Sequence, residues 1–216
     1  MKRRTFLAAS AGLPLLLATR ARAIGEGTQI ELVGLALPGL DDPRSLARGR
    51  LSWALRMRTS MDMRLDPRRV SLGDPALYDT PFAYLAGNHA FAMPDEPSIT
   101  QLRRFLELGG FLLVDDCSDG DGAFDAAIRA LLRRVMPDRP LRPVPSSHTI
   151  YHSFYLVDRP VGRIEGPAQV EGVEVDGRLA VVYSRHDLGG AYSRDALGAY
   201  TFEVSPGGEE QREHAF

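Results

Sequence analysis

The sequence predicts an α/β fold with a mostly parallel central sheet and an antiparallel hairpin near the C-terminal end. Short apolar runs alternate with amphipathic helical segments, an order that builds parallel sheets through right-handed crossovers. Residues 111–114 are apolar at every position, as in a strand buried on both faces. Asp176-Gly177 separates two β-rich runs at 170–175 and 178–184, and this dipeptide favours a hairpin turn because it tolerates positive φ.

The composition is that of a globular protein with a substantial core. Of the 216 residues, 44% are apolar and 25% are charged, which excludes a wholly disordered chain. No internal repeat or linker interrupts the pattern, so residues 24–216 are predicted to form a single α/β domain.

Residues 1–23 are predicted to be a twin-arginine-type signal peptide. Arg3-Arg4 precedes Phe6-Leu7, residues 8–18 form a short apolar region, and Ala21-Arg22-Ala23 matches a small-x-small cleavage site. The apolar region is too short to span a bilayer, so no transmembrane span is expected after cleavage. An uncleaved amphipathic arm is the alternative interpretation. Export by this route would place the mature protein in the periplasm.

Cleavage makes the chain more acidic and narrows the classes of partner. The leader holds five of the 26 Lys and Arg residues and none of the 28 acidic ones, so the mature net charge is −7. An acidic chain without a basic stripe is a poor nucleic-acid binder. A small molecule, a sugar, a peptide or an envelope protein is the expected partner. The single cysteine cannot form an internal disulfide.

The first half of the chain is expected to begin with a strand and a helix. The strand covers residues 28–37, and Asp41 or Asp42 caps a helix that runs to about residue 59. The core-facing stripe of this helix is expected to contain Leu46, Trp53 and Met57, widened by Leu51, Ala54 and Leu55. Further extended segments are expected at 70–72, 81–89 and 148–157, with a glycine-rich loop at 187–192.

The second helix has the clearest start signal in the chain. Ser98 and Gln101 match a capping box, in which each side chain satisfies a backbone N–H group of the first turn. Gly109 is the expected left-handed stop of this helix. After the buried strand, Asp121 is expected to cap a third helix that ends before Pro137.

Polar residues follow the predicted strands, at the edge of the sheet where open α/β proteins bind ligands. Asp115 and Asp116 come directly after residues 111–114, and Asp187 follows the hairpin. Two neighbours on a strand point to opposite sides, so only one of the paired aspartates is expected to face a cleft. The residues expected to bind ligand are Asn88, His89, Asp115, Asp116, His148, Tyr151, His152, Tyr155, Asp187 and Gly189.

The histidines offer a second chemistry. His148 and His152 share a face whether the segment is helical or extended, and with Asp116 they could form a two-His-one-carboxylate site for a divalent metal. A pair of hydrogen-bonded structural histidines explains the spacing equally well. Cys117 follows a strand, as many nucleophiles do, but the carboxylates beside it disfavour a thiolate, so an idle buried thiol is favoured.

Several stretches together resemble the bacterial domain-of-unknown-function 4159 family. They are Leu51–Leu55 with Arg58–Ser60, Pro81–Gly87, Gly109–Cys117, and His148–His152 with Asp187–Ala191. Residues 209–216 resemble the opening of that family's final helix. The family is similar in fold to the class I glutamine-amidotransferase-like group, which includes trehalose-utilisation (ThuA-like) proteins. The resemblance therefore implies a flavodoxin-like sandwich and brings no established activity.

The sequence departs from the amidotransferases of that group. They place a catalytic cysteine at the central elbow, with a His-x-Glu motif downstream. Here Asp115-Asp116 occupies about that point, Cys117 comes slightly later, and no His-x-Glu follows. Glutamine hydrolysis is therefore not expected.

The residue set supports two functional hypotheses. The first is an exported binding module whose strand-end cleft holds a sugar, a peptide or an envelope partner without turnover. The alternative is a hydrolase in which Asp115 or Asp116, with His148 and His152, holds a divalent metal that activates water. Twin-arginine export often carries cofactor-loaded proteins, which adds weight to the hydrolase. The incomplete catalytic set favours the binding module.

Overall fold

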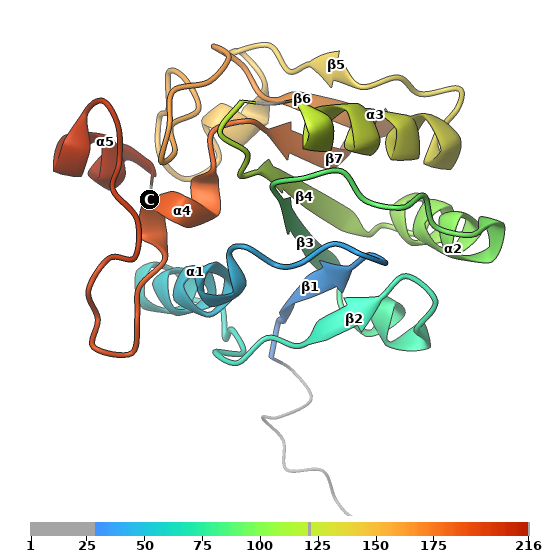
Figure 1. The fold of residues 1–216 in the computed structure, drawn as a ribbon, viewed down its shortest axis with the longest axis horizontal. Coiled ribbons are helices and arrows are strands. Elements are labelled where there is room, and N and C mark those ends of the chain that lie inside the picture. Colours follow the sequence, from blue (N-terminus) through green and yellow to red (C-terminus); the bar gives the residue numbers. More distant parts are fainter. Residues whose placement is uncertain (1–28, 121, 216) are drawn as a thin grey trace, which may run out of the picture.

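The computed structural model describes residues 29–120 and 122–215, which form a seven-stranded sheet with helices on both faces (Figure 1). The strand order is β2-β1-β3-β4-β7-β6-β5. The strands are β1 (Leu32–Ala36), β2 (Arg69–Ser71), β3 (Phe82–Gly87), β4 (Phe111–Asp116), β5 (Arg142–Pro143), β6 (Glu171–Val175) and β7 (Arg178–Ser184). The strands from β2 to β7 pair in parallel, and β6 pairs antiparallel with both β7 and β5.

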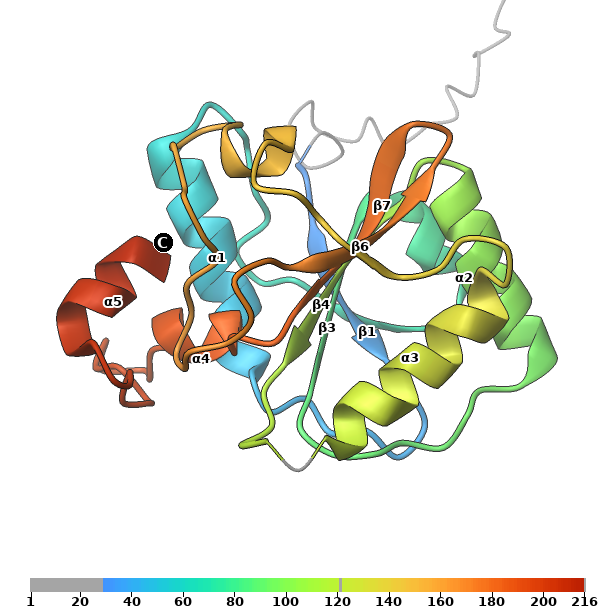
Figure 2. The same cartoon turned by 90° about the horizontal axis from the view of Figure 1, so that it is seen from above.

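Helices cover the sheet in two layers, so the fold is a flavodoxin-like sandwich (Figure 2). One layer holds α2 (Glu96–Glu107) and α3 (Ala123–Val135). The other holds α1 (Ser45–Arg58), α4 (Leu188–Tyr192) and α5 (Gly208–Ala215). Short 3₁₀ helices occupy η1 (Pro75–Asp79) and η2 (Thr149–Tyr151). The larger part of the core lies between the sheet and the α2–α3 layer. The buried face of α3 carries Phe124, Ile128, Leu131, Leu132 and Val135.

The central strand and the hairpin form as the sequence predicts. β4 pairs with β3 and β7 and continues through both aspartates, two residues beyond the apolar run. Asp176 and Gly177 connect β6 to β7 with φ angles of 52° and 77°. These positive values are those that a tight hairpin turn requires.

The expected core stripe of α1 is wrong in part, because Ala54 is buried and Leu51 and Leu55 pack partly buried against the core, but its other members do not. Leu46, Trp53 and Met57 are exposed, whereas the buried face of the helix carries Ala47, Arg48, Ser52 and Ala54. Small residues of α1 and the side chain of Arg48 fill its contact with the sheet and α4. At Gly34 of β1, an added Cβ would lie 2.5 Å from Cζ of Arg48, so the arginine occupies the space that the glycine leaves.

The helix starts also differ in detail from the prediction. α1 begins at Ser45 after Arg44, whose side chain makes no cap hydrogen bond. The cap of α2 is Asp95, which accepts a 3.0 Å hydrogen bond from the Ser98 amide, so the helix starts three residues before the predicted capping box. Gly109 has a φ of 112° just after α2, as expected of a stop. Asp121, the predicted cap of α3, lies outside the described residues.

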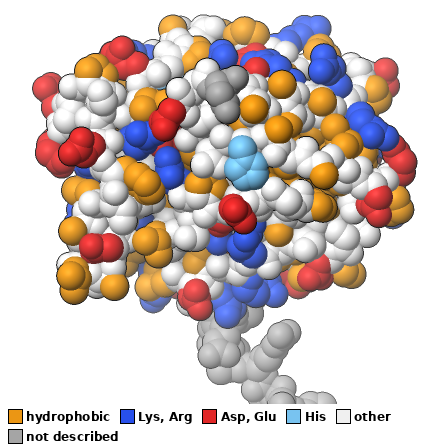
Figure 3. All heavy atoms as spheres, in the orientation of Figure 1, with side chains coloured by type: hydrophobic (Ala, Val, Ile, Leu, Met, Phe, Trp, Pro, Cys, Tyr) orange, Lys and Arg blue, Asp and Glu red, His pale blue; other side chains and the backbone are white. Residues whose placement is uncertain are grey.

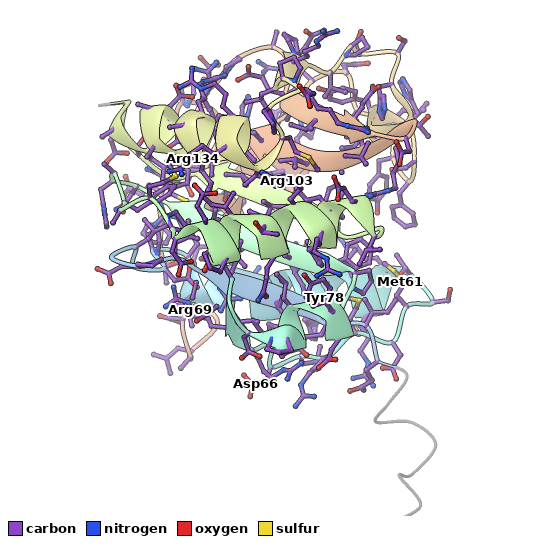
Figure 4. All side chains as sticks on the ribbon, turned by 90° about the vertical axis from the view of Figure 1, so that its right-hand side faces the viewer. Met61, Asp66, Arg69, Tyr78, Arg103 and Arg134 are labelled. Atoms are coloured by element: carbon purple, nitrogen blue, oxygen red, sulfur yellow. The ribbon has the colours of Figure 1, made fainter. Side chains whose placement is uncertain are left out.

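The α2–α3 layer is tied together at its ends. Arg103 of α2 donates hydrogen bonds to the carbonyl oxygens of Val135 (2.7 Å) and Arg134 (2.8 Å), at the C-terminal end of α3. Figure 4 shows Arg103 between the two helices. A cation at this end also complements the helix dipole.

Two connecting segments have a different structure from the one expected. Residues 148–157 contain η2 and turns in place of an extended strand, and residues 187–192 form the short helix α4 in place of a loop. α4 forms because Asp187 caps it and because its glycines allow close contact. A Cβ at Gly189 would lie 2.4 Å from the Tyr84 hydroxyl oxygen.

The surface mixes charges of both signs. On the face drawn in Figure 3, acidic and basic side chains are interspersed with apolar ones. No helix in the part of the chain that the structure describes is long and apolar enough to cross a bilayer. The predicted leader, residues 1–23, lies outside the described residues.

Candidate functional site

The first component of the strand-end site is Asp115, the fifth residue of β4. Its carboxylate is fully buried on the α1 side of the sheet and accepts three hydrogen bonds. The Tyr84 hydroxyl donates at 2.7 Å, and the backbone amides of Leu188 and Gly189 donate at 2.8 and 2.7 Å. Asp115 therefore binds the N-terminal end of α4 from a neighbouring strand.

The second component is Asp187, which lies just before α4 with a φ of 50°. It accepts a hydrogen bond from the Gly190 amide at 3.0 Å, and Arg44 binds both of its oxygens, at 2.6 and 2.5 Å. Arg163 contacts the same carboxylate and reaches Asp119 at 2.8 Å. A fork-to-fork arginine pair of this kind is a strong, geometrically fixed contact.

The two buried aspartates differ in pKa because their charged neighbours differ. Burial and the charge of Asp187 raise the pKa of Asp115 to about 7, against the lowering effect of its three hydrogen bonds. Burial alone would raise the pKa of Asp187, but Arg44 and Arg163 outweigh burial and hold it below its ordinary value. The pair therefore carries one firmly ionised carboxylate beside one that titrates near neutrality.

Cys117 lies beside this pair as a buried thiol. Burial and the charges of Asp115 and Asp187 raise the pKa of the Cys117 thiol well above its ordinary value. Its Sγ lies 3.5 Å from the backbone oxygen of Asp115. A protonated, inaccessible thiol is a poor nucleophile, which agrees with the idle thiol that the sequence favours.

Asp115, Cys117 and Asp187 are the one described group of three potential ligands whose atoms lie within 4.8 Å of one another. The donors around the group do not fit a divalent cation. The carboxylate oxygens already accept backbone, tyrosine and arginine hydrogens, and Arg44 and Arg163 bring positive charge to the position a cation would need. The cluster is therefore an internal ion-pair network.

Asp116 points to the other face of the sheet, as expected for a neighbour of Asp115. It accepts hydrogen bonds from the amide and hydroxyl of Ser118, at 2.9 and 2.6 Å. The Tyr183 hydroxyl lies 3.0 Å from Asp116 and 2.9 Å from Asp125. Both aspartates of the pair are buried, so neither presents a free carboxylate to a cleft.

Among the described residues, no group of three potential ligands contains Asp116, His148 and His152, so the structure gives this metal site no support and it stays a prediction. In the segment after β5, Tyr151 packs with Val144 and Val170 in an apolar cluster of its own.

The histidines of this segment have structural contacts. Nδ1 of His148 accepts the Ile150 amide at 3.1 Å and so caps η2. Nε2 of His152 lies 3.0 Å from the carbonyl oxygen of Ser146, which can only accept, so this nitrogen carries the proton. These hydrogen bonds support the interpretation that His148 and His152 have structural roles. Tyr151 is buried and Tyr155 is exposed beside Phe154.

Asn88 and His89 follow β3 at the carboxyl edge of the sheet, as predicted. Asn88 is exposed, and Nδ1 of His89 lies 2.8 Å from the carbonyl oxygen of Ala90. Of the ten residues predicted to bind a ligand, the buried network therefore contains Asp115, Asp187 and Gly189.

Sequence reasoning missed three members of the network, Tyr84, Arg44 and Arg163. The position of Arg44 could have predicted its acidic partner, because a cation at the start of a helix is unfavourable beside the positive end of the helix dipole unless an acid lies next to it. Tyr84 had a weaker signal, a hydroxyl within an otherwise apolar run. Arg163 lies in an irregular segment whose pattern gives no indication of its partner.

A small open pocket lies nearby at the carboxyl ends of β1 and β2. Its volume is about 220 Å³. It is lined by Ala36, Leu37, Pro38, Ser71, Leu72, Gly73, Pro94 and Ser98. These residues follow two parallel strands and begin α2, so the pocket lies where open α/β sheets bind ligands.

A family model described as a domain of unknown function, DUF4159, matches residues 38–216. The chain belongs to this family. No curated protein matches the sequence. The match to this DUF4159 domain begins at residue 38, just after β1, and covers every other strand.

Proposed function

We propose that this chain is a ligand-binding module of the cell envelope, and that its ligand occupies the strand-end pocket without being turned over. One observation carries the proposal. The open pocket is lined by apolar side chains and two serine hydroxyls and by no titratable side chain, whereas the acids and the thiol at the end of β4 are buried and bonded within the chain.

The pocket lies at the carboxyl edge of the sheet, where open α/β proteins bind ligands. The strand order reverses between β1 and β3, so the pocket, which opens at the ends of β1 and β2, borders the reversal through β1. The volume of about 220 Å³ is below the usual range for drug-sized ligands, so a single sugar ring, an amino acid or the end of a peptide is the expected size.

The proposal also places the mature protein in the periplasm, on the pattern of residues 1–23. Fold similarity to the glutamine-amidotransferase-like and ThuA-like group stays a prediction. Glutamine hydrolysis is not proposed, because burial raises the pKa of the single cysteine, Cys117. Metal-dependent hydrolysis is not proposed, because no described group of three potential ligands contains His148 or His152.

Gly73→Val tests the pocket. The φ of Gly73 is not in the left-handed region, and an added Cβ would lie 4.0 Å from the Ser98 hydroxyl oxygen, so the larger side chain fits only by filling the pocket. Neutral sugars, amino acids and dipeptides would be screened by ligand-observed NMR. We expect at least one to bind the wild type and to bind Gly73→Val about tenfold more weakly or worse.

Ala126→Val is the matched control, because it adds the same kind of atoms on the exposed side of α3. It should bind as the wild type does. Equal binding by Gly73→Val would move the site elsewhere, and conversion of any probe into a product would replace the binding module with an enzyme.

A further inference from the structure

A second hollow lies on the outer side of α1, away from the strand ends. Its volume is about 400 Å³, and it shares no lining residue with the strand-end pocket. It is lined by Arg50, Trp53, Ala54, Arg58, Arg194, Tyr200 and Glu213. These residues come from α1, from α5 and from the red-orange segment that runs beside α1 in Figure 1. We call it the arginine groove.

Aromatic rings and guanidinium groups are paired in the arginine groove. Cζ of Arg50 lies 3.9 Å from the ring centre of Trp53, and Cζ of Arg194 lies 4.1 Å from that of Tyr200. Arg194 is also fixed by hydrogen bonds to the Gly198 carbonyl (3.0 Å) and the Tyr200 hydroxyl (2.7 Å). The cation is therefore held in position before any ligand arrives, which lowers the entropic cost of binding.

The charge of the groove is opposite to that of the mature chain. Its lining has three arginines and one acid, Glu213. Partial burial and the positive charges of Arg194 and Arg58 lower the pKa of Arg50, so the guanidinium groups repel one another. Gathering like charges in this way costs free energy, and a bound anion would offset that cost.

The single tryptophan adds an apolar surface to this cationic site. Trp53 is 41% exposed although Arg50 lies over its ring. A planar or sugar ring can cover such a surface, while an acidic group on the same molecule meets the guanidiniums. An inorganic anion would contact the arginines and leave the ring of Trp53 uncovered.

We propose that the arginine groove binds a small organic anion, a carboxylate or phosphate carried on an aromatic or sugar ring. The acidic group lies among the three arginines and the ring lies against Trp53. This site is independent of the proposed function, because its lining and its ligand chemistry differ from those of the strand-end pocket.

Trp53 supplies the measurement, because it is the only tryptophan in the chain. The mature protein would be titrated with benzoate, phenyl phosphate, glucuronate and glucose 6-phosphate while its fluorescence is recorded. Phenol, glucose and inorganic phosphate are the matched probes that lack either the acid or the ring. We expect a saturable change with acidic ring compounds, and the relative affinities of carboxylates and phosphates identify the preferred acid.

Variants assign the binding to the groove. Glu213→Gln removes a repelling charge and should tighten binding about two- to fivefold. Arg194→Gln should weaken it about tenfold, and Arg104→Gln, on the exposed side of α2, should leave it unchanged. Because Arg194 also holds its loop, the gain in Glu213→Gln is the decisive result.

Three results would overturn the proposal. The first is the absence of any fluorescence change with all acidic ring probes. The second is equal binding of phenol or glucose, which would show that charge is not recognised. The third is a Glu213→Gln variant that binds no more tightly than the wild type. None of these results would affect binding at the strand-end pocket, which Gly73→Val tests.

Discussion

Asp115 occupies the end of the central strand, where an open α/β sheet commonly presents a reactive group. Its carboxylate instead accepts two backbone amides of α4 and the Tyr84 hydroxyl. The amides can only donate, but the tyrosine hydroxyl can also accept, so a protonated Asp115 remains fully bonded. The residue can therefore change its protonation state without leaving its place.

The pKa of Asp115 predicts a pH dependence of stability. Its folded-state pKa of about 7 is above the unfolded value of about 4, so between these values the folded chain holds a proton that the unfolded chain has released. Stability from this residue is present below pH about 4 and is lost as the pH rises through 7. Asp115→Asn should remove this dependence.

The measurement is urea unfolding of the wild type and Asp115→Asn between pH 5 and pH 8. We expect the stability advantage of the wild type to shrink by about 2 kcal/mol over that range. An advantage that stays constant over that range would mean that the three hydrogen bonds keep Asp115 ionised throughout.

At the scale of elements, α4 depends on its neighbours. A helix of five residues is too short to be stable alone. Asp115 reaches it from β4, and Arg44 reaches its cap residue Asp187 from the start of α1. One buried ion pair thus connects the N-terminal ends of two helices that are far apart in sequence.

Arg44→Met should separate these two helix starts. The variant keeps much of the side-chain volume but leaves buried Asp187 with Arg163 as its charged partner, which should cost about 3 kcal/mol of the free energy of unfolding. Arg104→Met, on the exposed side of α2, should cost less than about 0.5 kcal/mol. Similar losses in the two variants, measured by urea unfolding, would show that the ion pair contributes little.

At the scale of the whole molecule, the sandwich separates its polar features. The buried network lies at the carboxyl edge on the α1 side, and the strand-end pocket opens beside the start of α2. The arginine groove lies on the outer side of α1. Two different hollows on one small sheet suit a protein that binds more than one molecule.

The predicted twin-arginine export is also a property of the whole molecule, because this route carries folded proteins. The double variant Arg3→Lys with Arg4→Lys should keep the protein out of the periplasm, because the paired arginines are read by a receptor that lysines satisfy poorly. Fractionation of cells followed by immunoblotting measures this directly. Lys2→Arg, which keeps the charge beside the motif, should be exported as the wild type is. Periplasmic protein from the double variant would contradict twin-arginine export.

The sequence by itself determined the features that depend on neighbouring residues. Residues 111–114 form a buried strand because every position is apolar, and Asp176-Gly177 turns because both residues accept positive φ. Gly109 ends a helix for the same local reason. Each of these signals lies within a few neighbouring residues, so the local structure it favours does not depend on distant parts of the chain.

Only the tertiary structure decided which side chains meet. Asp115 lies 74 positions from Gly189, and their contact depends on the pairing of β4 with β7. Trp53 is exposed, although a helical pattern placed it in the core, and the described group of three potential ligands contains neither His148 nor Asp116. The environment of a side chain is set by segments far away in the chain, and residue type and local spacing do not encode that pairing.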